Sequence, residues 1–286
     1  MDIGWYTQIA LNGFMAGMLY VVIALGFSMV YGVMRIVNFA HGHLYMLGGL
    51  FMYGITATFG LDFFVSLLIS AVAVGLVGMV LEKAVFAPLK NLESPSVIAG
   101  IGAAIFIGGI ADIITAGETR RVEAPWHGSI QIGDIFLPSH RLIISGIALA
   151  AVLTFWAFLR YTKFGRATRA TVDDSEIAAA YGIDIRRVYA VNFALAAALA
   201  GLAGALVAPI TGASPDVALP AMFKAFIVVI LGGLGSVPGA VLGGLILGFL
   251  DSTITTLISS AMAQMLSFLV VLIVLVIRPV GLLGRT

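Results

Sequence analysis

The stretch IALNGFMAGMLYVVIALGFSMVYGV, residues 9–33, decides the fold of this chain. It contains 25 residues, and none of them carries a charge. About 20 consecutive apolar residues are enough to cross the hydrocarbon core of a bilayer as an α-helix. A helix suits that environment because it satisfies its backbone polar groups internally. The stretch therefore predicts a membrane-spanning helix.

Similar apolar runs recur almost to the end of the chain. We expect spans near residues 9–33, 43–59, 63–82, 97–117, 141–160, 188–209, 222–235, 238–258 and 263–278. The run 222–235 is short and leads into GGLGSVPG at 232–239, so a broken or re-entrant helix near 222–239 is an alternative that leaves eight full spans. The predicted fold is an all-α, polytopic transmembrane helix bundle of about 8–9 spans.

The composition agrees with one membrane domain covering residues 1–286. Hydrophobic residues make up 61% of the chain and charged residues 10%, against about 25% charged residues in soluble domains. A net charge of +1 with no basic stripe gives no electrostatic basis for binding nucleic acid, so membrane lipid is the expected surrounding. The absence of cysteine excludes disulfides, thiolate metal sites and thiol nucleophiles. Only Asp2 is charged before Arg35, so we expect no cleaved signal peptide.

The distribution of Lys and Arg predicts the orientation, because these residues accumulate in cytoplasmic loops. With the N-terminus outside, the inner side holds 11 of the 15, namely Arg35, Lys83, Lys90, Arg160, Lys163, Arg166, Arg169, Arg186, Arg187, Arg278 and Arg285. The outer side holds Arg120, Arg121 and Arg141, and Lys224 lies near the outer end of its span. We therefore expect the N-terminus outside and the C-terminus inside, with residues 118–140 as the largest outer loop.

The inner segment 160–187 contains the pattern of a short helix. Within DDSEIAAAYGI, residues 173–183, an aspartate is placed to cap the helix N-terminus, Glu176 favours the first turn, the alanines propagate it and Gly182 ends it. The small residues Ala178, Ala179 and Ala180 would form an exposed face that suits docking into a groove of another protein. A solvated loop that only obeys the charge rule is the alternative.

The segment RIVNFAHGH, residues 35–43, is a polar interruption between two apolar runs. Its Asn, His and Gly residues would line a water-filled cavity or break a helix, because irregular backbone at membrane depth is tolerated only inside protein or beside water. The alternative is an ordinary inner loop with interfacial histidines.

Ionisable residues within the spans are few, so an ion relay is not expected. They are Asp112, Asp251 and Lys224, and we interpret the two aspartates as interfacial or locally hydrogen-bonded. An enzyme is also disfavoured. All four histidines, His41, His43, His127 and His140, are expected in loops, and neither a zinc-binding histidine pair nor a phosphate-binding glycine loop is present. We assign no catalytic residue, metal or cofactor, so another chain must supply the energy for uphill transport.

Three segments resemble the permeases of branched-chain amino-acid ABC transporters. GFSMVYGVMRIVNFAHG at 26–42, followed by MLG at 46–48, is similar to their N-terminal signature and most resembles the smaller, H-type member of the paired membrane subunits. Residues 165–183 resemble the segment that couples these permeases to their ATPases, and LGGLGSVPGA at 231–240 resembles their late glycine-rich loop.

The resemblance implies a multi-subunit importer in the bacterial cytoplasmic (inner) membrane. Its partners would be two cytoplasmic ATPase subunits, a second permease subunit and a periplasmic or lipid-anchored substrate-binding protein. The coupling residues would be Gly165, Arg166, Arg169, Asp174, Glu176, Ala178, Ala179 and Gly182, and Asn38, His41 and Gly42 would shape the inner end of the translocation path. Branched-chain amino acids are the expected cargo. Urea, amides and aromatic compounds remain alternatives, as does an ion-coupled carrier or channel that needs no ATPase.

Overall fold

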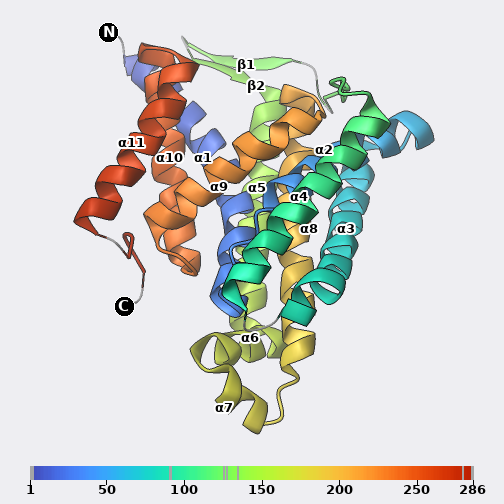
Figure 1. Cartoon of the computed structure of the whole chain (residues 1–286). Helices are drawn as coiled ribbons and strands as arrows, with labels where there is room; N and C mark the ends of the chain where they lie inside the picture. The colour runs from blue at the N-terminus through green and yellow to red at the C-terminus, as the bar shows by residue number, and fades with distance from the viewer. Residues whose placement is uncertain are drawn as a thin grey trace.

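The computed structural model describes residues 3–89, 92–124, 126, 128–133, 135–278 and 280–284. A helix occupies every segment in which a span is expected (Figure 1). These are α1 (Ile3–Met34), α2 (His41–Phe59), α3 (Phe63–Leu81), α4 (Glu93–Thr115), α5 (Ser139–Tyr161), α8 (Ile185–Thr211), α9 (Ala218–Gly232), α10 (Val237–Leu257) and α11 (Ser260–Ile277). The prediction of an all-α bundle is confirmed, while Lys90, Pro125, His127 and Arg285 lie outside the described residues.

The helices form a buried centre and an exposed periphery. Within the most apolar part of each helix, 78% of the residues of α1 and 67% of those of α8 are buried, against 22% for α4 and 17% for α11. The peripheral helices expose large apolar side chains such as Leu68, Ile105 and Ile113. Such continuous apolar exposure is costly in water and favourable in lipid, so the bilayer is the natural solvent of this surface.

Within the described residues, eight helices are long and apolar enough to cross a membrane, and α2 is not one of them. The sequence suggested that the span at 222–235 would be the short one. In the structure α9 begins earlier than expected and, with the preceding turn η3 (Pro215–Val217), reaches span length. The break after it is present: Gly233 and Gly235 have φ values of 106° and 78°, and α10 starts at Val237.

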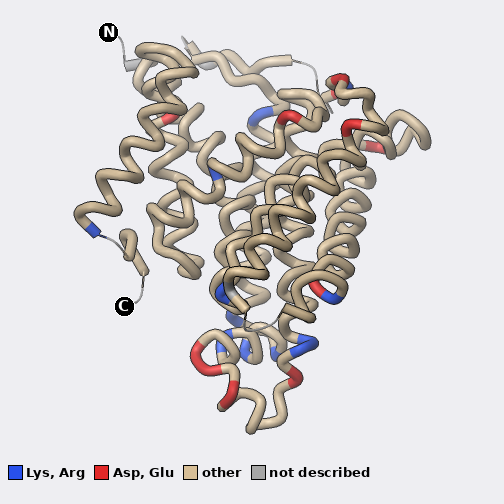
Figure 2. Tube along the Cα trace, viewed as in Figure 1, with Lys and Arg blue, Asp and Glu red and all other residues tan. Residues whose placement is uncertain are grey.

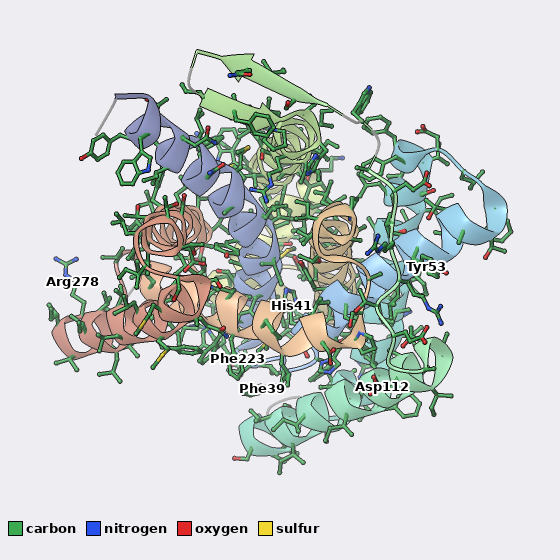
Figure 3. The ribbon with its side chains drawn as sticks, turned by 90° about the horizontal axis from the view of Figure 1, so that it is seen from above. Phe39, His41, Tyr53, Asp112, Phe223 and Arg278 are labelled. Atoms are coloured by element: carbon green, nitrogen blue, oxygen red, sulfur yellow. The ribbon has the colours of Figure 1, made fainter. Side chains whose placement is uncertain are left out.

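Helix α2 tolerates its lower hydropathy because protein covers its N-terminal part, where the buried residues lie between His41 and Met52. It packs against α8, α3, α9 and α4, and its first turn, with His41, lies near the middle of the bundle when viewed along the helices (Figure 3). At Gly48 a Cβ atom would collide with the backbone of Gly201 on α8. Close helix contact of this kind supplies dispersion energy that lipid cannot replace.

The glycines of α1 and α10 allow these two helices to pack closely against each other. A Cβ atom on Gly248 would collide with Gly17 and lie 2.5 Å from the carbonyl oxygen of Gly13. A Cβ atom on Gly244 would lie 2.9 Å from the backbone nitrogen of Val21. Both distances are shorter than a real Cβ contact, so the small-xxx-small spacing has a packing role here.

The segment after α1 returns into the bundle. Ile23 lies eleven residues before the end of α1 at Met34, or about 16 Å along the axis at about 1.5 Å per residue. Its carbonyl oxygen is 3.0 Å from Nε2 of His41. The alternative of an ordinary inner loop with interfacial histidines is therefore wrong for residues 36–40. This backbone runs at membrane depth and is covered by protein, which is where irregular backbone is tolerated.

The loop between α4 and α5 contains a two-stranded hairpin that the sequence did not predict. Strands β1 (Ser129–Ile132) and β2 (Ile135–Pro138) pair antiparallel, with Ser129 opposite Pro138. The backbone N–H of Phe136 donates to the side-chain oxygen of Gln8 on α1 at 2.8 Å. This ties the hairpin to the same end of the bundle as the start of α1, and we call it the hairpin end (Figure 1).

Candidate functional site

Two short helices, α6 (Lys163–Asp173) and α7 (Ser175–Ala180), project from the end of the bundle opposite the hairpin (Figure 1). We call them together the coupling module, after the role that the sequence predicts for this segment. Charged residues of both signs gather on and around it, whereas the long helices carry very few (Figure 2). The projection therefore offers a polar surface outside the apolar band of the bundle.

Helix α6 was not predicted as a helix of its own. The side-chain oxygen of Thr162 accepts the backbone N–H of Gly165 at 2.9 Å and caps its first turn. Gly165 is buried, and a Cβ atom there would collide with the carbonyl oxygen of Leu159. Arg169 is exposed and donates to that same carbonyl oxygen, and Arg166 is exposed beside it. Gly165 thus permits the sharp turn out of α5, and the two arginines face outward.

Helix α7 confirms the predicted pattern of cap, run and stop. One carboxylate oxygen of Asp174 accepts the backbone N–H groups of Glu176 and Ile177 at 2.8 and 2.9 Å. At the other end Gly182 has a φ of 85°, a left-handed conformation that favours glycine, and its N–H donates to the carbonyl oxygen of Ala179 at 2.9 Å. Asp174 and Gly182 therefore fix the two ends of α7.

The exposed face of α7 differs from the one predicted. Ala178 is buried, with 3% of its surface exposed, so the expected face of three alanines is wrong. Ala179 and Glu176 are exposed, as are two large side chains that the sequence reasoning missed: Ile177 at 57% and Tyr181 at 85%. Residues four apart share a helix face, and this spacing was the available signal for Ile177 and Tyr181.

A buried polar contact anchors the coupling module to the bundle. The amide nitrogen of Asn192 on α8 donates to the hydroxyl of Thr168 on α6 at 3.1 Å and to the carbonyl oxygen of Val188 at 2.7 Å. Both side chains are almost fully buried. Helix α8 packs against α1, α2 and α3. A displacement of α6 would therefore be transmitted through this contact to the centre of the bundle.

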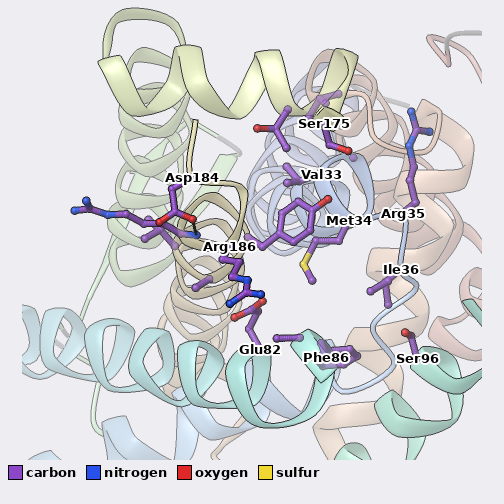
Figure 4. A pocket seen from close by; sticks show the side chains of 18 of the residues that line it. Val33, Met34, Arg35, Ile36, Glu82, Phe86, Ser96, Ser175, Asp184 and Arg186 are labelled. Atoms are coloured by element: carbon purple, nitrogen blue, oxygen red, sulfur yellow. Dashed lines mark hydrogen bonds between the residues drawn. The ribbon is translucent and has the colours of Figure 1, made fainter. Parts of the chain in front are cut away.

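A cavity of about 1240 Å³ lies between the coupling module and the adjacent helix ends. Its walls come from residues 32–36, which comprise the end of α1 and the two residues after it, and from the π-helical turn η1 (Glu82–Phe86). Residues 171–176 and the start of α8 complete the lining. Figure 4 shows Arg186 of α8 pointing across it toward Glu82, which is buried. The space between bundle and module is therefore lined by both and contains charged side chains.

The residues predicted for the inner translocation path lie deeper than expected. Asn38 and His41 are almost completely buried, and Asn38 accepts the backbone N–H of Ala40 at 3.0 Å. Gly42 is buried, and a Cβ atom there would collide with the carbonyl oxygen of Ala218. None of the three lines the cavity of about 1240 Å³. Their role in the path stays a prediction.

The expectation that all histidines lie in loops is also wrong. His41 and His43 belong to the first turn of α2, and His140 belongs to the first turn of α5. His127 lies outside the described residues.

Two ionisable residues of the spans form a pair that sequence spacing did not reveal. Lys224 on α9 makes a salt bridge with Asp251 on α10. Asp251 also accepts the hydroxyl of Tyr20 on α1 at 2.8 Å and that of Ser267 on α11 at 2.7 Å. The interpretation of Asp251 as locally hydrogen-bonded is confirmed, and the cluster joins four helices.

Comparison with known proteins gives a consistent result. The family model described as "Branched-chain amino acid transport system / permease component" matches residues 9–275. The chain is 32% identical to the high-affinity branched-chain amino acid transport system permease protein LivH of Escherichia coli (strain K12), over 98% of this chain and 96% of that protein. It is 29% identical to the permease protein BraD of Pseudomonas aeruginosa, over 99% of this chain and 97% of that protein.

Proposed function

Since this chain belongs to the branched-chain amino acid transport permease family and is an H-type member of it, we propose that it carries branched-chain amino acids across the bacterial cytoplasmic membrane. It is the membrane-spanning permease subunit of an ABC importer. In our proposal ATP is hydrolysed on separate subunits, and this chain provides half of the path through the bilayer.

The coupling module carries the mechanistic part of the proposal. It stands outside the apolar band, presents Ile177, Ala179 and Tyr181, and is joined to α8 through the buried pair of Thr168 and Asn192. Exposed apolar and aromatic side chains with charges around them are typical of the centre and rim of a protein interface. In our proposal the coupling module docks into a groove of an ATPase subunit. Arg166, Arg169 and Glu176 lie at the rim of that interface.

The proposed transport cycle is alternating access. Closure of two ATPase subunits on ATP displaces the coupling module, and the displacement passes through α6 to α8. Because α8 packs against α1, α2 and α3, its movement changes which end of the bundle is open. The further partners are a second permease subunit and a substrate-binding protein outside the membrane.

The proposed orientation places the hairpin end outside and the coupling module in the cytoplasm. Most Lys and Arg residues gather near the module, as the positive-inside rule requires (Figure 2). The chain has no cysteine, so single introduced cysteines report on sidedness without background. An impermeant thiol reagent added to intact cells should label Gln131→Cys and leave Tyr181→Cys unlabelled until the membrane is opened; the reverse pattern contradicts the orientation.

The test of coupling is Ala179→Glu in the complete transporter, reconstituted in liposomes with leucine-loaded binding protein. A charge and four further heavy atoms at the centre of the interface should abolish leucine uptake, while the ATPases lose their stimulation by the loaded binding protein. The matched control is Ala116→Glu, an exposed alanine at the hairpin end. Normal uptake by Ala179→Glu would refute the assignment of the coupling module.

The buried pair of Lys224 and Asp251 is the observation that favours the second candidate, an ion-coupled carrier. The same liposomes distinguish the two candidates. Uptake that continues without nucleotide and responds to a proton or sodium gradient supports the carrier, and uptake that requires ATP supports the importer. Competition by urea, short amides or aromatic acids in place of leucine would reassign the cargo and leave the ABC mechanism in place.

A further inference from the structure

A cavity of about 500 Å³ lies in the half of the bundle nearer the hairpin end. Its walls come from the first half of α1, the first turns of α5, the last turns of α8 and the first turns of α9. A second lobe of about 380 Å³ adjoins it and shares Asn12, Tyr20, Arg141 and Lys224 with it. The volume of the larger lobe is that of a small-molecule site, for which about 300–1,000 Å³ is typical.

Aliphatic side chains form most of the wall of the larger lobe. They come from three helices and one turn and include Leu19, Ile23, Ile144, Val207, Ile210 and Val217. Ile144 is only 1% exposed, so the wall continues into the packed core. Burial of a branched aliphatic group against such a wall is favourable because it removes apolar surface from water.

Three charged side chains also line the larger lobe, and their pairing differs. The ammonium group of Lys224 is neutralised by Asp251 and also lies 5.3 Å from the ring centre of Tyr20. Arg141 and Asp216 have no ion-pair partner in the part of the chain that the structure describes. The cavity therefore presents one unpaired cation and one unpaired anion beside an aliphatic wall.

We propose that this cavity selects a free α-amino acid with a branched aliphatic side chain. The guanidinium group of Arg141 binds the α-carboxylate, the carboxylate of Asp216 binds the α-ammonium group, and the aliphatic wall receives the side chain. Arginine suits the first role because its planar fork matches a carboxylate. This inference rests on the proposed function and adds a selecting site within this chain to the separate substrate-binding protein.

The arrangement also predicts that related solutes are rejected. An amide analogue without a carboxylate leaves Arg141 unmatched, and an acid without an amino group leaves Asp216 unmatched. A site built around polar groups discriminates strongly against a ligand that leaves one of them unpaired. A larger side chain is limited by Ile144 and the other core residues behind the wall.

The first experiment measures leucine uptake by the complete transporter in liposomes at saturating loaded binding protein. Arg141→Gln and Asp216→Asn should each lower the uptake rate by about tenfold or more, because each leaves one charge of the ligand without its partner. Arg141→Lys should retain more uptake than Arg141→Gln. Both side chains are exposed at the cavity, so these variants should fold normally, and co-elution of each variant with the ATPase subunits verifies the assembly.

The second experiment detects the ligand in the cavity directly. Ala221 lines the larger lobe, and Ala221→Cys is the only thiol in the chain, so its rate of modification reports on access. In the permease–ATPase complex without binding protein, L-leucine should slow the modification, while leucinamide and 4-methylpentanoate should not. Adding Arg141→Gln should remove the preference for leucine over leucinamide, and Asp216→Asn should remove the preference over 4-methylpentanoate.

The outcomes separate this inference from the proposed function. If the unaltered transporter imports no branched-chain amino acid, the proposed function fails. If it imports leucine while Arg141→Gln and Asp216→Asn stay within twofold of its rate, the proposed function stands and the site is wrong. Equal protection of Ala221→Cys by all three compounds, or protection by none, as expected for a cavity filled by a lipid chain, also overturns the site.

Discussion

The replacement Lys224→Met tests the salt bridge that joins α9 to α10. It removes the only cation beside Asp251 in the described cluster and leaves that carboxylate with the hydroxyl donors of Tyr20 and Ser267. The side chains of Lys224 and Asp251 are only 18% and 12% exposed, so water compensates little. Breaking a buried pair by removing one partner costs about 3–5 kcal/mol. We expect the lower part of this range, because two hydrogen bonds remain.

The assay is reversible unfolding of the purified permease in mixed micelles by titration with SDS, followed by tryptophan fluorescence. A loss of about 3 kcal/mol lowers the folding equilibrium constant more than 100-fold. Neutralising both partners, in Lys224→Met with Asp251→Asn, should recover part of that loss, because no unpaired charge remains. The exposed Lys163→Met is the control and should change stability little. A loss below about 1 kcal/mol, or full additivity of the two single changes, would refute a structural role for the pair.

Three further predictions concern packing, transmission and the cap of α7. Gly248→Leu should prevent normal assembly, seen as loss of the monodisperse peak in size-exclusion chromatography, because even a Cβ atom there collides with the α1 backbone; Gly54→Leu, where no atom lies within 4 Å of a Cβ, should elute normally. Asn192→Leu should reduce leucine uptake while ATP hydrolysis continues, since the contact between α6 and α8 is lost; uptake and hydrolysis that fall in equal proportion would argue against transmission. Asp174→Ala removes an N-cap worth about 1 kcal/mol and should increase amide hydrogen exchange in α7, whereas unchanged exchange would show that neighbouring helices hold it.

Features that depend on a few consecutive residues were predictable from the sequence. The spans follow from apolar runs, because each helix satisfies its own backbone. Both ends of α7 follow from Asp174 and Gly182, whose effects act within one helical turn. Helix α6 was missed because its buried face consists of Gly165, Thr168 and Thr171, and none of these residues is a strong helix former.

Features that depend on distant contacts were not predictable in this way. Lys224 and Asp251 are 27 positions apart, and Tyr20 and Asp251 are 231 positions apart, so no spacing rule connects them. Ala178 looked exposed because its neighbours are small, and only the fold shows that it turns toward the bundle. The cavity with Arg141 and Asp216 likewise combines residues from four separate parts of the chain.

The central position of α2 constrains how this protein is made. A helix of lower hydropathy that begins with His41, Gly42 and His43 partitions poorly from the translocon into lipid on its own. Its principal neighbour, α8, begins at Ile185, more than 120 residues after α2 ends at Phe59. Insertion therefore cannot proceed strictly span by span from the N-terminus: α2 takes its final place only when the C-terminal half arrives. Nascent chains that stop before α8 should leave α2 exposed to the quality-control proteases of the membrane.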